Sequence, residues 1–235
     1  MIVGVHQPHF LPWLGYFNKA LSSDVFVLLH SVQYRKNYFQ NRTRIRSVAG
    51  QPIWLTLPVH AHLGMRIDEI TLAEPRWRER VARTVEGCYG KAPFFGAVWP
   101  AITAALSEAE DRLEDVNEKS FRSVLSLLGG TLPRVVRSGE LSARSEDPPK
   151  RLVEICREVG ATRYLAGRGG RRYMRVEDFT EAGIEVVWQE YDASRVTYPQ
   201  GSGEFLGGLS ILDALACVGP AGTRALVLAG PGSDS

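Results

Sequence analysis

Cysteines are scarce in this sequence: only three occur among 235 residues, at Cys88, Cys156 and Cys217. They lie far apart, form no CxxC pair and are odd in number. This excludes a disulfide-rich scaffold and a closed cysteine zinc site. We expect all three thiols to be reduced and to pack on apolar helix faces of a cytoplasmic protein.

A targeting signal and a long apolar run are also missing. No basic segment precedes an apolar stretch in residues 1–6, so we expect no signal peptide. The best candidate for a membrane span, residues 205–222, is interrupted by Asp213 and Pro220. We expect it to form a buried helix over residues 209–218 followed by a loop, and we expect no membrane partner.

The net charge is small, since 28 basic and 26 acidic residues give +2. Hydrophobic residues make up 44% and charged residues 23% of the chain, which is typical of a globular protein and excludes a disordered or collagen-like chain. We expect a single α/β domain over residues 1–228, with a helical insertion at about 75–130. We expect residues 229–235 to be a disordered tail.

Acidic residues are absent between Asp24 and Asp68, a stretch that holds Arg35, Lys36, Arg42, Arg44, Arg46 and Arg66. A second basic stretch, residues 157–175, contains six arginines and a single acid, Glu158. Segregated charge at low net charge suggests binding of a small anionic substrate rather than a general nucleic-acid surface. The alternative is that these arginines pair with acids elsewhere in the fold.

Apolar runs at residues 2–5 and 24–29 flank a helical segment at 13–21, which favours a βαβ unit. Helical spacing returns in the insertion and again over residues 152–159. Further strands are expected at 52–59, 134–136, 164–166 and 184–191, whereas residues 31–47 have no clear period. The alternation predicts an α/β fold with a mostly parallel sheet flanked by helices.

Two blocks of the sequence resemble the WbqC family. They are HQPHFLPWLGYFNK at residues 6–19, and VQY at 32–34 followed by NYFQNRTRI at 37–45; weaker matches extend over almost the whole chain. The resemblance implies a biosynthetic enzyme of surface-polysaccharide or specialised-metabolite clusters, with acyl or aminoacyl transfer onto an amine. The family usually has two acids just before the VQY triplet, where this chain has His30 and Ser31.

The first block holds the candidate catalytic residues His6, His9 and Tyr16, with Gln7 as a candidate substrate-binding residue. They fall on or just after the first strand, where α/β sheets bind ligands, and two imidazoles can act as acid and base. The block also resembles the nucleotide loop of HUP-type nucleotidyltransferases, which implies a Rossmann/HUP-like N-terminal half and a site for ATP with Mg²⁺. The alternative is that His6 and His9 only shape the turn.

Amide, aromatic and cationic side chains crowd the second block. The candidate substrate-binding residues there are Gln33, Tyr34, Lys36, Asn37, Gln40, Asn41, Arg42 and Arg44. Guanidinium and amide groups without nearby acids suit a carboxylate or phosphate, and the aromatics can stack on a base or sugar. The alternative is an amphipathic strand whose polar side faces water.

Three further candidates are Arg168, Gly169 and Gly170, in a glycine-arginine turn that follows an expected strand and can bind an anion through its N–H groups. Tyr198 and Gln200 are candidates for lining a pocket, and we expect a structural role for the isolated acid Asp213. No metal site is expected, although His60 and His62 have permissible ligand spacing.

Three functions remain open from the sequence. The first is acyl or aminoacyl transfer onto the amine of a small metabolite or nucleotide-linked sugar, with aminoacyl-tRNA or a carrier-bound group as possible donors. The second is ATP-dependent adenylation or ligation. The third is a non-catalytic module that binds tRNA or a pathway partner through the basic stretches.

Overall fold

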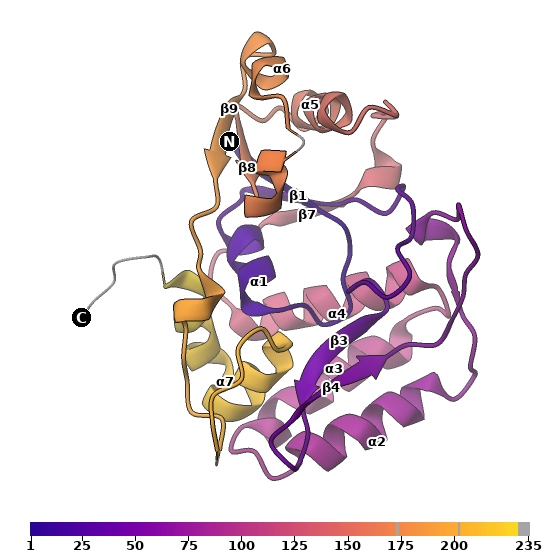
Figure 1. Cartoon of the computed structure of the whole chain (residues 1–235), viewed down its shortest axis with the longest axis vertical. Helices are drawn as coiled ribbons and strands as arrows, with labels where there is room; N and C mark the ends of the chain where they lie inside the picture. The colour runs from indigo at the N-terminus through magenta and orange to yellow at the C-terminus, as the bar shows by residue number, and fades with distance from the viewer. Residues whose placement is uncertain (173, 202, 230–235) are drawn as a thin grey trace.

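The computed structural model describes residues 1–172, 174–201 and 203–229. Its centre is a parallel sheet in the spatial order β7-β2-β1-β8-β9 (Figure 1). The strands are β1 Ile2–His6, β2 Val25–Leu28, β7 Arg134–Arg137, β8 Arg163–Ala166 and β9 Glu185–Trp188. Numbered along the chain, this is the doubly wound order 3-2-1-4-5, which confirms the expected α/β fold.

Both faces of the sheet are covered, because every residue of β2 is buried and successive side chains point to opposite faces. Phe26 and Leu28 belong to one core, against α1 Leu14–Leu21 and α4 Leu113–Leu128. Val25 and Val27 belong to a second core, lined by α5 and α6. Figure 1 shows these helix pairs on opposite sides of the sheet; α5 is Pro148–Glu158 and α6 is Val176–Glu181.

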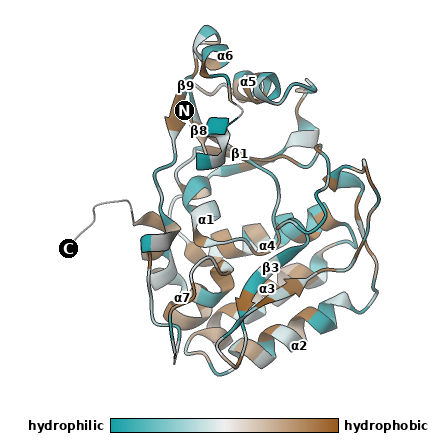
Figure 2. Ribbon diagram, in the orientation of Figure 1, coloured by the Kyte–Doolittle hydropathy of each residue, from teal (hydrophilic) through white to brown (hydrophobic). Residues whose placement is uncertain are grey.

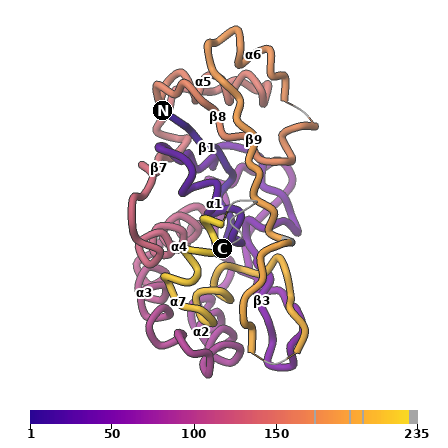
Figure 3. The backbone as a smooth tube through the Cα atoms, turned by 90° about the vertical axis from the view of Figure 1, so that its left-hand side faces the viewer, coloured from indigo at the N-terminus to yellow at the C-terminus, as the bar shows by residue number. Residues whose placement is uncertain are grey.

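The residues between β2 and α4 supply a second layer beneath α1 and α4 (Figure 3). Here β3 Arg42–Arg46 pairs antiparallel with β4 Pro52–Thr56, and β5 Val59–His60 pairs with β6 Thr71–Leu72. Helices α2 Trp77–Tyr89 and α3 Phe95–Glu108 complete this region. The single strand expected over 52–59 is therefore two strands, both outside the parallel sheet. Short 3-10 turns are η1 Ile67–Glu69, η2 Ser138–Glu140, η3 Arg168–Arg172 and η4 Ala193–Arg195.

The last helix, α7 Ile211–Leu228, breaks after residue 218, as expected, but a second helical segment follows where a loop was expected. Gly219 has φ +72°, which breaks the helix, but Pro220 starts a second helical segment in the favoured first-turn position. By length and composition alone α7 is apolar enough to cross a membrane, yet half of it is buried and it packs on α1, α3 and α4 as a core helix. Most of the tail expected to be disordered, residues 230–235, lies outside the described residues.

Candidate functional site

The strand order reverses between β1 and β8. From β1 the chain adds β2 and β7 on one side of the sheet, and from β8 it adds β9 on the other side. The two strands are parallel, with Gly4 opposite Leu165. His6 and Gly167 therefore leave the sheet at neighbouring positions. In open α/β sheets, ligands bind in the crevice at this switch point, outside the carboxyl ends of the strands.

The loop after β1 is held in a strained shape. Leu11 has φ +40°, an uncommon value for a non-glycine residue. Its carbonyl oxygen accepts hydrogen bonds from the hydroxyls of Thr43 at 3.0 Å and Ser210 at 2.7 Å, and the Phe10 N–H donates to the Phe39 carbonyl at 3.1 Å. Strain of this kind persists only where the surroundings fix it, and it is frequent at functional sites.

His6 stands at the end of β1, partly exposed. Its Nδ1 lies 2.9 Å from the Gln7 carbonyl oxygen, which also accepts the Tyr16 hydroxyl at 3.0 Å. A carbonyl cannot donate, so Nδ1 carries the proton and Nε2 keeps a lone pair. Burial, and then the charge of Lys19, lower the pKa of His6 to about 3, so the ring is neutral at pH 7.

Lys19 lies beneath this strand, only 3% exposed, and its Nζ donates to the Val5 carbonyl at 2.7 Å. Burial lowers the pKa of Lys19 to about 7. Protonation of this amine therefore changes the charge behind His6 near neutral pH.

His9 is enclosed by aromatic rings. It is 1% exposed, and the rings of Trp13, Tyr16, Tyr38 and Phe39 have centroids between 5.4 and 5.9 Å from its own. Neither ring nitrogen has a hydrogen-bond partner among the described residues. Burial, and then repulsion from His6 when that ring is protonated, hold the pKa of His9 well below its ordinary value, so both imidazoles are neutral at pH 7.

A relay of amides fixes the orientation of Gln7. The backbone N–H of Arg35 donates to Gln40 Oε1 at 2.7 Å, so the other end of the Gln40 amide is its donor. That Nε2 donates to Gln7 Oε1 at 2.9 Å, which leaves the Gln7 Nε2 as a donor directed away from the relay. Asn117 supports the arrangement, since its Nδ2 donates to the Gln40 carbonyl at 2.8 Å.

The basic residues of the second block surround a surface turn. Lys36 and Asn37 are exposed, and Arg42 donates to the Asn37 carbonyl while its guanidinium lies 4.1 Å from the Trp54 ring centroid. Arg44 is partly exposed on the same face of β3. Within the described part of the chain, no carboxylate forms an ion pair with Lys36, Arg42 or Arg44. These cations are thus available to an anionic ligand.

The other members of this block have structural contacts. Gln33 is exposed and forms a β-bridge with Arg66, and the Tyr34 N–H donates to the Met65 carbonyl at 2.8 Å. Asn41 is buried, and its Nδ2 donates to the Leu57 carbonyl at 2.9 Å. The structure therefore places Gln40 in contact with Gln7. Asn41 instead links the start of β3 to the residue after β4 through its hydrogen bond to Leu57.

The glycine-arginine turn forms η3, a hydrophilic segment beside β1 (Figure 2). Arg168 is exposed and lies 3.7 Å from an oxygen of Asp192. Gly169 is exposed, whereas Gly170 is buried, and a Cβ on Gly170 would meet Met174 Sδ at 2.8 Å. This second basic stretch is partly neutralised within the fold, as the alternative from the sequence expected.

Tyr198 and Gln200 contact Asp213 in a buried cluster between α7 and the segment after β9. The Asp213 carboxylate accepts the hydroxyls of Tyr89 at 2.9 Å and Tyr198 at 2.8 Å, and Gln200 Nε2 at 2.8 Å. Arg46 donates to Gln200 Oε1 at 3.3 Å. Burial raises the pKa of Asp213, and these donors oppose the shift. Asp213 thereby ties α7 to α2 and to the 198–200 segment, which is a structural role.

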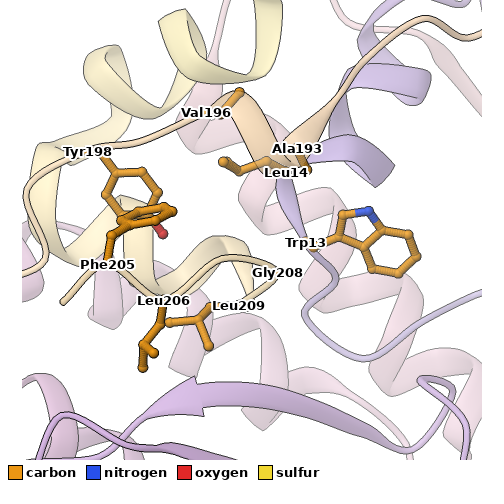
Figure 4. A pocket seen from close by; sticks show the side chains of 9 residues that line it. All are labelled: Trp13, Leu14, Ala193, Val196, Tyr198, Phe205, Leu206, Gly208 and Leu209. Carbon is orange, nitrogen blue, oxygen red and sulfur yellow. The ribbon is translucent and has the colours of Figure 1, made fainter.

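A narrow pocket is lined by Tyr198 and Phe205 on one side and by Trp13 on the other (Figure 4). Its volume is about 10 Å³, enough for a single water molecule and too small for a substrate. Tyr198 thus lines a pocket, but its hydroxyl is engaged by Asp213.

The sequence pattern of the WbqC-like protein family matches residues 7–225. The chain belongs to this family. It is also similar to a Mycobacterium tuberculosis protein, Rv1507c, with 31% identity over 221 residues, 92% of this chain and 94% of the relative. No solved structure matches the chain. The family assignment confirms the resemblance carried by the histidine loop and the VQY block.

In the part of the chain that the structure describes, the histidine loop and the first turn of α1 offer no site for a metal ion or a nucleotide phosphate. Among the described residues, no group of three His, Cys, Asp or Glu side chains is arranged to hold a metal ion. The first turn of α1, where a HUP-type loop would place phosphates, is filled: a Cβ on Gly15 would meet Trp13 Nε1 at 3.0 Å and the Tyr191 ring at 3.2 Å. The residues of this turn do not fit a phosphate group.

Three residues around the histidine loop were missed from the sequence: Trp13, Lys19 and Asn117. Trp13 and Lys19 lie within the family's first block, where they look like ordinary helix residues. Asn117 interrupts the apolar face of α4 between Val116 and Phe121, and it is 0% exposed. A polar residue on an apolar helix face was the signal that could have identified it.

Proposed function

We propose that this WbqC-like protein is a biosynthetic group-transfer enzyme that moves an acyl or aminoacyl group onto the amine of a small molecule. The observation that carries the proposal is the neutral His6 at the sheet's switch point, with Nδ1 bound to Gln7 and Nε2 free to accept a proton. A neutral imidazole fixed in one tautomer can accept a proton, and with a pKa of about 3 it passes that proton on readily to a leaving group.

In the proposed reaction the amine nitrogen attacks the acyl carbonyl and a carbon–nitrogen bond forms. His6 Nε2 accepts the proton that the nitrogen loses, and delivers it to the leaving group as the bond between acyl carbon and leaving group breaks. The leaving group is a thiol of an acyl carrier or a ribose hydroxyl of tRNA. Tyr16 keeps the loop in place through the Gln7 carbonyl.

The developing oxyanion needs a donor that is fixed before the reaction. Gln7 Nε2 fits this role, because the relay from the Arg35 N–H through Gln40 holds Gln7 Oε1 as the acceptor. Lys36, Arg42 and Arg44, which pair with no carboxylate in the described residues, would hold the anionic part of the donor or acceptor.

The test is a matrix of donors and acceptors analysed by mass spectrometry for amide products. Acyl-CoA and aminoacyl-tRNA donors are each combined with amino acids and amino sugars, with and without ATP and Mg²⁺. We expect an ATP-independent amide product, lost in His6→Asn and kept in His62→Asn, a matched change at an exposed histidine outside the site.

Three outcomes contradict the proposal. Product formation that requires ATP and releases AMP or ADP would assign the protein to the adenylating enzymes. Full activity in His6→Asn would show that His6 is not the general base. Salt-sensitive binding of tRNA without any turnover would instead favour a binding module. A cytoplasmic location, where such donors are found, is part of the same proposal.

A further inference from the structure

A second pocket, with a volume of about 450 Å³, lies at the carboxyl ends of β2 and β7. Four separate segments line it: His30, two residues after β2; η1 with the residue before it; the start of α4; and the end of β7 with η2. The lining residues are His30, Arg66, Asp68, Glu69, Arg112, Glu114, Arg137, Gly139 and Glu140. This volume is within the range of small-molecule sites, and none of these residues belongs to the histidine loop.

His30 is a buried group without a partner in this pocket. It is 2% exposed, and neither ring nitrogen has a hydrogen-bond partner among the described residues. Its hydrogen bonds involve the backbone and not the side chain: the His30 N–H donates to the Ser138 hydroxyl at 3.0 Å. Burial lowers the pKa of the ring to about 4, so one nitrogen donates and the other accepts at neutral pH. An unpartnered imidazole of this kind indicates a ligand that completes its hydrogen bonds.

The arginines of the pocket are already paired. Arg66 contacts Asp68 at 2.9 Å and Arg112 contacts Glu114 at 3.3 Å. Arg137 forms ion pairs with two carboxylates that do not line the pocket, Asp115 at 3.2 Å and Glu118. No arginine of the lining is therefore left for an anionic ligand.

Negative charge is in excess on the same wall. Glu69 Oε2 accepts only the backbone N–H of Arg66, at 2.7 Å, and within the described residues neither Glu69 nor Glu140 has an ion-pair partner. Glu114 has 15% side-chain exposure, and burial raises its pKa because the charges of Arg112 and Arg137 only partly offset desolvation. A cation in the pocket would be stabilised by all three carboxylates.

We propose that this pocket binds a small molecule with a primary ammonium group, placed among Glu69, Glu114 and Glu140, and with a hydroxyl or amide group that pairs with His30. The binding itself does not depend on the transfer reaction. If that reaction is correct, the pocket holds the acceptor amine, and this assignment alone rests on the proposed function.

The experiment is an NMR titration of the full-length ¹⁵N-labelled protein with glucosamine and with ethanolamine. Glucose is the control for glucosamine, since it replaces the ammonium group by a hydroxyl. We expect saturable shifts of the Asp68, Gly139 and Glu140 amides and of the His30 ring with both amines, and none with glucose. In the double variant Glu69→Gln/Glu140→Gln we expect binding to weaken at least tenfold, whereas Glu190→Gln, an exposed change elsewhere, leaves it unchanged.

The inference is overturned if neither amine gives saturable shifts at these residues, or if glucose gives the same shifts. Unchanged binding in the double variant would also overturn it, as would shifts caused by inorganic phosphate in place of the amines. Because no turnover is measured, the result is separate from the test of group transfer. Amine binding without any amide product would keep this inference and reject the proposed function.

Discussion

The imidazole of His6 donates through Nδ1 to the carbonyl oxygen of Gln7 at 2.9 Å, and this contact decides which nitrogen of the ring can accept a proton. With a pKa of about 3, the ring remains neutral far below the ordinary histidine value of about 6.5. The chain therefore holds a base in one tautomer at the switch point of its sheet.

We expect nitrogen-detected NMR of the His6 ring to show the Nδ1–H tautomer unchanged from pH 7.5 to pH 5.0. The reason is that burial and the charge of Lys19 both disfavour the imidazolium. Free histidine in the same tube provides the reference, because it titrates within this range. A His6 signal that titrates near pH 6.5 would contradict the arrangement.

Removal of the Gln7 amide is expected to lower kcat for transfer by about 10²–10³, the usual cost of losing one oxyanion donor. Gln7→Leu makes this change. Gln40→Leu should also lower kcat, by a smaller factor, because the Gln7 side-chain amide can then rotate and exchange the positions of its oxygen and nitrogen. Steady-state kinetics check both, with Gln51→Leu, an exposed change, as the control. If Gln40→Leu has wild-type kcat, the relay does not orient Gln7.

Lys19 makes stability depend on pH in a defined direction. Its pKa is about 7 in the folded chain and about 10.4 when unfolded, so the unfolded chain binds more protons between these values. The stability of the wild type relative to Lys19→Met should therefore rise by about 2 kcal/mol from pH 7.0 to pH 8.5. Chemical denaturation of both proteins at several pH values measures the difference. A constant or falling difference would show that Lys19 is charged when folded.

The strained Leu11 should lose its support in two coupled steps. Thr43→Val and Ser210→Ala each remove one hydroxyl from the Leu11 carbonyl, and each should cost about 1–2 kcal/mol. Since the two donors share one acceptor, the double variant should deviate from additivity by at least about 0.5 kcal/mol. Denaturant unfolding of the four proteins measures this cycle. Strict additivity would mean that the two hydroxyls act independently.

Loss of the buried carboxylate at Asp213 should destabilise the fold severely. Asp213→Ala leaves the hydroxyls of Tyr89 and Tyr198 without an acceptor, and Gln200 Nε2 keeps only the Leu206 carbonyl. We therefore expect a cost of about 3 kcal/mol and a Tm lower by about 6–12 °C. Glu79→Ala removes the partner of an exposed arginine, Arg76, and should change Tm by less than about 2 °C. Thermal unfolding compares them, and equal effects would show that the Asp213 cluster is not structural.

The sequence by itself determined the local features of this protein. The apolar runs of β1 and β2 and the 3.6-residue spacing of the helices predicted an α/β fold, because burial of alternate faces is a property of short segments. The same local pattern placed His6, Gln7 and His9 on or just after the first strand. The reduced cysteines were also foreseen: Cys88, Cys156 and Cys217 are all free in the structure.

Only the tertiary structure decided which polar side chains meet. Gln40 lies 33 residues from Gln7 yet fixes its amide, and Tyr198 and Gln200 turn to Asp213. The second pocket joins four segments around His30, so no single stretch of sequence carries its pattern. Hydrogen bonds and ion pairs between distant residues depend on how the chain is packed. The hydrophobic periodicity within one segment does not determine that packing.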